Sequence, residues 1–184
     1  MVRLGGNGQA GIAAEPWLAE PVEHPPALLA HQLYEQRWMF HGPAFQVVAR
    51  TLGVGPRGIR AVLRPTEAAG SLLDGAGQVL GQWLIEHRPE SWIAFPAAVD
   101  RVTFHAPPPE AGTDVECALR VVRVSDDAVT ADMRLTGSDG LPLATVTGWH
   151  DRRFAGGPRT GARRPGESRS RCGLIPLHQA CFAA

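Results

Sequence analysis

Residues 71–84, SLLDGAGQVLGQWL, contain the pattern that decides the fold. Leucine, alanine, valine and tryptophan recur there at steps of three and four residues, which is the spacing of one helix face. The pattern predicts a helix over residues 70–87 that is apolar enough to be largely buried. A single carboxylate, Asp74, lies inside this apolar run, with Gln78 one turn further along.

Shorter elements surround this helix. Runs rich in valine and isoleucine, separated by glycine, proline and aspartate, predict strands joined mostly by short turns. The expected elements are a helix over 27–38, strands over 44–55 and 58–65, and, after the central helix, extended segments over 92–107, 114–124, 127–137 and 143–154. A helix that is apolar nearly all round needs a curved sheet to cover it, so this order predicts an α+β hot-dog fold, an antiparallel sheet wrapped round one central helix.

The length of 184 residues is enough for one domain with a sizeable core. Residues 1–23 contain several glycines and little periodicity, which is typical of a flexible lead-in or the remnant of a linker. We expect the domain itself over residues 24–154. Residues 155–184 are rich in arginine, glycine and proline and predict a disordered tail.

Composition excludes several classes of protein. Hydrophobic residues make up 44% of the chain and charged residues 20%, as in ordinary globular proteins. The 18 basic residues, all arginine, balance 18 acidic ones, and the basic run in the tail has no interleaved aromatics, which argues against nucleic-acid binding. The three cysteines lack metal-ligand spacing, and no apolar stretch resembles a signal peptide or a membrane span, so we expect a cytoplasmic protein.

Asp74 has two interpretations. An acid in the first turn of a helix interacts favourably with the helix dipole, which is a common structural role. Alternatively, an acid inside an apolar run faces a cleft, where desolvation favours the neutral carboxylic acid and makes it a proton donor. Gln78 lies four residues further on, hence on the same helix face and within reach of a hydrogen bond to Asp74.

Three short motifs occur in a characteristic order: HGPAFQ at 41–46, LLDGAGQ at 72–78 and AFP at 94–96. With this spacing, residues 30–154 resemble the C-terminal hot-dog half of the dehydratase domains of polyketide synthases. The Phe-His-Gly-Pro form of the first motif is most similar to synthases of the enediyne and other iterative types. Dehydratase domains of this family are double hot dogs, with the acid on the second central helix.

The resemblance implies dehydration of a β-hydroxyacyl group to a trans-2-enoyl group on an acyl carrier protein. It implies no metal or redox cofactor, because the phosphopantetheine arm of the carrier belongs to the substrate. Asp74 matches the acid that protonates the departing hydroxyl, and Gln78 matches the residue that orients it. His41 stands where the family usually has tyrosine. The matching positions for substrate binding along the acyl tunnel are Gly42, Pro43, Phe45, Phe95 and Pro96.

The base of the family is a histidine in the motif HxxxGxxxxP of the first hot dog. None of the seven histidines here is followed by glycine at the fourth position. Dehydration needs a base as well as an acid, so the chain is expected to be incomplete without a histidine-bearing half. Its expected partners are an acyl carrier protein and either a second hot-dog half or a second copy of the chain in a homodimer. His41 is the internal alternative for the base; otherwise it is a loop histidine that bonds backbone.

Two other functions stay open: a non-catalytic fragment of a synthase, and a hot-dog acyl-thioester binder or thioesterase in which the helix acid activates water. Trp83 and Trp92 are expected in the core or a dimer seam, or alternatively along a ligand tunnel. The other histidines are predicted to be structural: His24 and His31 at the surface, His87 at the C-terminal end of the central helix, and His105 and His150 at strand ends without a carboxylate at diagnostic sequence spacing.

Overall fold

A computed structural model describes residues 22–87 and 93–154 of the chain. Its elements are α1 (Ala30–Glu35), the 3-10 turn η1 (Pro43–Phe45), β1 (Val48–Gly55), β2 (Gly58–Leu63), α2 (Ser71–His87), β3 (Ile93–Phe104), β4 (Val115–Val124), β5 (Ala128–Thr136) and β6 (Pro142–Phe154). The predicted order of helices and strands is confirmed. Helix α1 is shorter than predicted: it begins only at Ala30, and it ends early because Arg37 takes a left-handed conformation (φ 56°).

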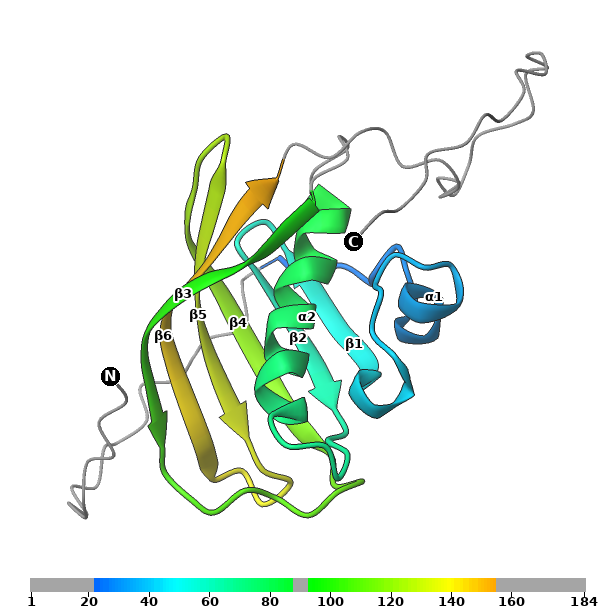
Figure 1. Ribbon diagram of the computed structural model, residues 1–184, viewed down its shortest axis with the longest axis vertical. Helices are drawn as coiled ribbons and strands as arrows, with labels where there is room; N and C mark the ends of the chain where they lie inside the picture. Colours follow the sequence, from blue (N-terminus) through cyan, green and yellow to red (C-terminus); the bar gives the residue numbers. More distant parts are fainter. Residues whose placement is uncertain (1–21, 88–92, 155–184) are drawn as a thin grey trace, which may run out of the picture.

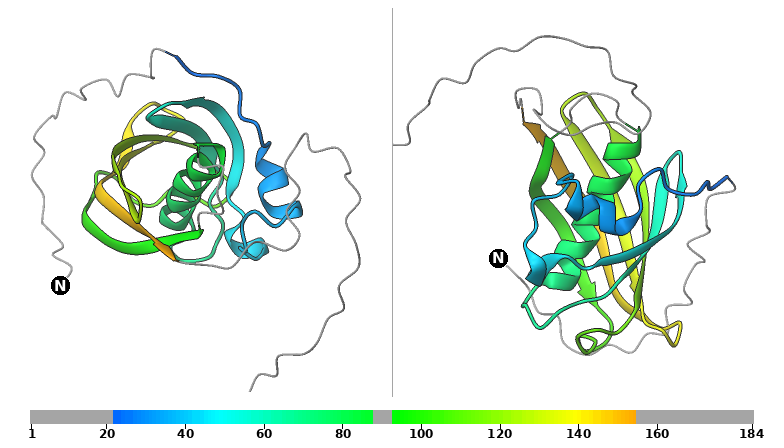
Figure 2. Two further views of the ribbon diagram at one scale, coloured as in Figure 1. Left: turned by 90° about the horizontal axis from the view of Figure 1, so that it is seen from above. Right: turned by 90° about the vertical axis from the view of Figure 1, so that its right-hand side faces the viewer.

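The six strands form one antiparallel sheet in the order β1-β2-β4-β5-β6-β3. The sheet curls round α2, which is seen nearly end-on from above (Figure 2), while α1 lies beside β1 at the outer side of the sheet (Figure 1). Strand β3 follows α2 in the sequence but crosses to the far edge, where it pairs with β6. This is the hot-dog fold that the sequence predicts.

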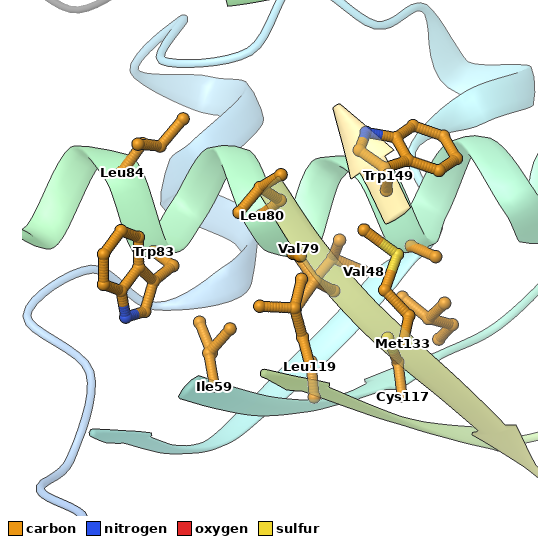
Figure 3. Packing of buried hydrophobic residues seen from close by; sticks show 14 of the residues in the cluster. Val48, Ile59, Val79, Leu80, Trp83, Leu84, Cys117, Leu119, Met133 and Trp149 are labelled. Carbon is orange, nitrogen blue, oxygen red and sulfur yellow. The ribbon is translucent and has the colours of Figure 1, made fainter. Parts of the chain in front are cut away.

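The core lies between α2 and the concave face of the sheet. Val79 and Trp83 of α2 point toward Leu119 of β4 and Ile59 of β2 (Figure 3), and Leu80 is buried in the same cluster. The Trp83 indole N–H also donates to the carbonyl of Gly55 (3.1 Å), so its polar atom is satisfied inside the core. Trp83 is therefore a core residue, whereas Trp92 lies outside the described residues.

Gly75 lets α2 approach the sheet closely. A Cβ atom at this position would overlap the Val47 side chain and lie 3.3 Å from Cδ1 of Leu63. Both neighbours are buried in the core, so neither has free space to move into. The small residue at position 75 thus sets the distance between helix and sheet.

We expect Gly75→Ala to lower the free energy of unfolding by about 1–2 kcal/mol, because overpacking costs ~1–3 kcal/mol and the better helix propensity of alanine returns at most about 1 kcal/mol. Gly81→Ala is the matched control in the same helix, since the nearest atom to its Cβ would be Met39 Cε at 3.4 Å. Its stability should equal or exceed that of the wild type. Urea unfolding measures all three proteins, and equal stabilities of the two variants would contradict the close approach.

Strand β3 is an edge strand that pairs, within the described residues, with β6 alone. Val99 and Phe104 lie opposite the core residues Trp149 and Ala144 of β6. Nevertheless, their exposed fractions are 38% and 59%. One margin of the concave face is therefore left apolar and partly open.

The predicted lead-in and tail fall almost entirely outside the described residues, so the domain boundaries stay predictions. Glu23, at the end of the lead-in, forms a two-point ion pair with Arg60 of β2 (2.9 and 2.7 Å). His24 makes a short antiparallel bridge to Val54 of β1 through its backbone. None of the helices in the described ranges is long and apolar enough to cross a membrane.

Candidate active site

Asp74 lies in the first turn of α2, where its backbone N–H donates to the carbonyl of Gly70 (2.9 Å). Its side chain is 38% exposed, so it is neither sealed in the core nor freely solvated. Both interpretations of the sequence thus describe the same position: the carboxylate complements the helix dipole and also reaches a cavity.

Gln78 is buried one turn further along α2, and its amide is fully bonded. Its Nε2 donates to Asp74 Oδ2 (2.7 Å) and to the carbonyl of Phe45 (2.7 Å). Its Oε1 accepts the phenol O–H of Tyr34 (2.6 Å). The hydrogen bond expected from the four-residue spacing is present, so Gln78 holds one oxygen of the acid in a defined direction.

His41 comes to Asp74 from the loop between α1 and η1. Its Nε2 lies 3.4 Å from Asp74 Oδ2, and its ring stacks on Phe40 with centroids 4.6 Å apart. Its Nδ1 is the one buried side-chain polar atom without a hydrogen-bond partner among the described residues. The ring therefore faces the acid. The alternative prediction, in which the His41 ring hydrogen-bonds to backbone, is not observed among the described residues.

A cavity of about 160 Å³ opens beside these three side chains. Its walls are formed by Trp38, Met39, Phe40, His41, Asp74, Gly77, Gln78, Gly81, Leu84, Ile85, Ala94, Phe95, Pro96, Trp149 and Asp151. Apart from the two aspartates, His41 and Gln78, this lining consists of apolar and aromatic residues and glycine. We call it the acid cavity.

The acid cavity contains two of the five residues predicted to bind substrate, Phe95 and Pro96. Gly42 and Pro43 are exposed and do not line it. Phe45 is also absent from its walls and contributes only its backbone carbonyl, which accepts from Gln78. For all five residues substrate binding stays a prediction of the family resemblance.

Two aromatic residues in the wall of the acid cavity, Phe40 and Phe95, belong to a cluster of aromatic rings. The Phe40 and Phe95 rings lie 5.8 Å apart, and Phe95 meets Phe154 edge-on at 5.4 Å. Phe40 is 78% exposed and Phe154 is 55% exposed. This cluster joins the loop before η1 to the paired ends of β3 and β6, and it offers apolar contact to a ligand entering from solvent.

Asp151 of β6 is a site residue that the sequence reasoning missed. It is 3% exposed, lines the acid cavity and accepts the indole N–H of Trp149 at Oδ1 (2.7 Å). Burial raises the pKa of this carboxyl to about 6, although the bond from Trp149 acts in the opposite direction. A signal was available: Asp151 follows Trp149 by two residues, so in a strand both side chains point to the same face.

A larger hollow of about 690 Å³ lies at the N-terminal end of α2, between segments 65–73 and 106–111. Glu67 and Glu110 are the charged residues among its walls. None of the predicted site residues lines it. The candidate chemistry therefore lies in the smaller acid cavity.

The other histidines lie away from the acid cavity. His24 and His31 are exposed, as predicted, and His87 stacks on Trp83 at the end of α2. His150 has a carboxylate partner in the structure. Its Nε2 lies 3.0 Å from Asp100 Oδ1 of the neighbouring strand β3, a cross-strand proximity that sequence spacing does not show.

Comparison with known proteins decides the family. A family model described as the polyketide synthase dehydratase N-terminal domain matches residues 13–160. The chain belongs to the polyketide synthase dehydratase family. The predicted resemblance is thereby confirmed at the level of the family. No curated protein matches this dehydratase-family chain in sequence.

Solved dehydratases share the fold of this family member. The dehydratase domain from the CurJ module of curacin polyketide synthase has a TM-score of 0.58 at 16% identity, over 69% of this chain and 48% of its own. The bifunctional dehydratase-cyclase domain of ambruticin biosynthesis has a TM-score of 0.59 at 24% identity, over 77% of this chain and 51% of its own. The dehydratase domain of RzxB from Pseudomonas fluorescens has a TM-score of 0.52 at 14% identity, over 66% of this chain and 47% of its own. This chain thus spans about half the length of the structures it matches.

Proposed function

We propose that this chain supplies the acid half of a dehydratase that acts on a β-hydroxyacyl thioester of an acyl carrier protein. The observation that carries the proposal is the convergence of Gln78 and His41 on one oxygen of Asp74, at the wall of a mostly apolar cavity. An oriented acid beside an apolar cavity suits the protonation of a leaving hydroxyl. Membership of the dehydratase family supports this reaction.

In the proposed reaction a base removes the proton from Cα, and its electron pair forms the Cα–Cβ double bond. The Cβ–O bond breaks, and the hydroxyl leaves as water with the proton of Asp74. Asp74 remains as a carboxylate that Gln78 stabilises by its N–H. His41 provides a polar contact beside the acid. These steps move protons without a change of oxidation state overall, so we propose no metal or redox cofactor.

We propose that the chain corresponds to the C-terminal half of a double hot dog and that a histidine-bearing half supplies the base. The motifs around Asp74 and the absence of HxxxGxxxxP support this position. The matching family model is described as an N-terminal domain, so the assignment rests on these motifs and on the half-length coverage. A histidine-to-phenylalanine variant of the CurJ dehydratase is inactive, which shows the importance of a histidine in that protein.

The open margin of β3 is the proposed contact for the histidine-bearing half. A long edge strand with exposed apolar side chains is a surface that another strand or domain can cover. We expect Val99→Lys to weaken association with the histidine-bearing half at least about tenfold, since a charge would be buried at the contact. Val122→Lys on β4 is the matched control, because Val122 is similarly exposed (45% against 38%).

Analytical ultracentrifugation of the mixed halves measures this effect. Equal losses in the Val99 and Val122 variants would show that the β3 margin is not the contact. The unfolding free energy of each variant, measured separately, excludes damage to the fold.

A thioester assay tests the proposed function. A 3-hydroxyacyl pantetheine thioester is incubated with the chain, with a histidine-bearing half, and with both together. We expect the absorbance of the conjugated enoyl thioester to rise only with both. Release of free thiol by the chain alone would indicate a thioesterase, and binding without either product in the mixture would indicate a non-catalytic module.

A further inference from the structure

Tyr34 belongs to none of the motifs of the sequence, yet it connects α1 to the acid through Gln78. Its hydroxyl donates to Gln78 Oε1 (2.6 Å) and accepts the backbone N–H of Val48 (3.0 Å). It is the one tyrosine of the chain. The hydroxyl therefore stands between a backbone group of β1 and the amide that holds Asp74.

Two backbone groups, the N–H of Val48 and the carbonyl of Phe45, determine which partner donates in each hydrogen bond that links Tyr34, Gln78 and Asp74. The Val48 N–H can only donate, so the Tyr34 oxygen accepts it and the phenol proton goes to Gln78 Oε1. The Phe45 carbonyl can only accept, so the Gln78 amino group faces it. The second N–H of this amino group then donates to Asp74 Oδ2.

The consequence for Asp74 is that Oδ2 must be an acceptor. When Asp74 is the neutral acid, its proton is therefore on Oδ1. No side chain in the described part of the chain forms a hydrogen bond or ion pair with Oδ1. Oδ1 is the oxygen left available to a substrate.

We propose that Tyr34 is a positioning residue, which holds the Gln78 amide so that its amino group faces Asp74 and the acidic proton stays on Oδ1. This deepens the proposed function and rests on it for its catalytic consequence. Without the phenol O–H, the Phe45 carbonyl is the one group left in this network that opposes rotation of the Gln78 amide, so the amide presents its carbonyl to Asp74 for part of the time. The acidic proton would then go to Oδ2, away from the substrate.

The Tyr34 phenol stays a donor at any pH at which the protein is assayed. Burial raises the pKa of Tyr34 to about 12, and the negative charge of Asp74 contributes in the same direction. The bond from the Val48 N–H acts in the opposite direction but does not outweigh burial.

The next turn of α2 provides a matched control. Gln82 is held in the same manner: the Thr51 hydroxyl donates to its Oε1 (2.7 Å), and its amino group donates to the carbonyl of Leu28 (3.0 Å) and to Glu86 (3.4 Å). Thr51→Val removes a hydroxyl from this second network as Tyr34→Phe does from the first. Gln82 and Thr51 are not in the acid cavity.

The first measurement needs no activity. In the full chain, labelled with ¹⁵N in its glutamine side chains, we expect two well-separated amide proton signals for Gln78. They should broaden or converge in Tyr34→Phe and stay unchanged in Thr51→Val. Because Tyr34 is the sole tyrosine, 3-fluorotyrosine provides a second variant with a stronger donor, and it should move a Gln78 N–H signal downfield. Unchanged Gln78 signals in both altered proteins would overturn the proposal.

The second measurement is turnover with the histidine-bearing half. We expect Tyr34→Phe to lower kcat about tenfold with little change in KM, because the loss concerns proton transfer and not binding. Thr51→Val should leave both constants unchanged. If kcat fell equally in the two variants, the role of Tyr34 would be structural only. If the wild type shows no dehydration, the proposed function fails, while the Gln78 signals still decide the positioning.

Discussion

Asp74→Asn should lower the rate of dehydration by about 10²–10⁴-fold when the chain is assayed with a histidine-bearing half, the range typical of a lost general acid. Asparagine has nearly the same shape as aspartate, but it has no acidic proton to give to the leaving hydroxyl. The Asp74 side chain is 38% exposed, so the substitution leaves no sealed polar group unpaired. We therefore expect the unfolding free energy to change by less than about 1 kcal/mol.

Asp126→Asn is the control for this experiment. Asp126 is an exposed residue between β4 and β5, and the chemical change is the same. Turnover by this variant should equal that of the wild type. Wild-type turnover by Asp74→Asn would remove Asp74 from the mechanism, whatever the family resemblance implies.

Asp151→Asn should change how stability depends on pH. Folding raises the pKa of Asp151 from an ordinary value of 3.8 to about 6. The folded state therefore binds more protons than the unfolded state between these values, and the wild type loses stability as the pH rises through this window. The loss from this one residue is about 3 kcal/mol, at about 1.4 kcal/mol for each pKa unit. Asparagine does not ionise, so the variant should gain that amount relative to the wild type between about pH 4 and pH 7.

Urea unfolding at several pH values measures the difference between the two proteins. Trp149→Phe supplies the second variant, because it removes the N–H that favours the ionised form of Asp151. It should raise the pKa of Asp151 further and extend the window of falling stability to higher pH. A difference between wild type and Asp151→Asn that does not vary with pH would contradict burial of this carboxyl in the acid cavity.

Much of the fold could be predicted from the sequence because its signals are local. The three- and four-residue spacing over 70–87 reflects a helix covered by a curved sheet, and valine-rich runs between turn residues mark the strands. The position of β3 beside β6 depends on a crossover, for which no local pattern exists. The early end of α1 depends on the backbone of Arg37, a residue type that rarely takes a positive φ.

The candidate site, like the fold, was predictable only where its contacts are local in the sequence. Asp74 and Gln78 lie four residues apart on one helix, so their hydrogen bond follows from helix geometry. Tyr34 reaches Gln78 across 44 residues, and no spacing rule connects them. Asp151 stands beside two arginines in the sequence, DRR, which suggests an exposed strand end, whereas the alternation from Trp149 places it inside.

The central claim is that this chain provides the acid of a dehydration whose base comes from another half. The most direct test is the mass of an acyl group on its carrier protein after mixing with the chain alone, with a histidine-bearing half alone, and with both. A 3-hydroxyacyl carrier should lose one water only in the mixture of both halves. Equal loss of water in the presence and absence of this chain, or no loss with both halves in a confirmed complex, would contradict the account.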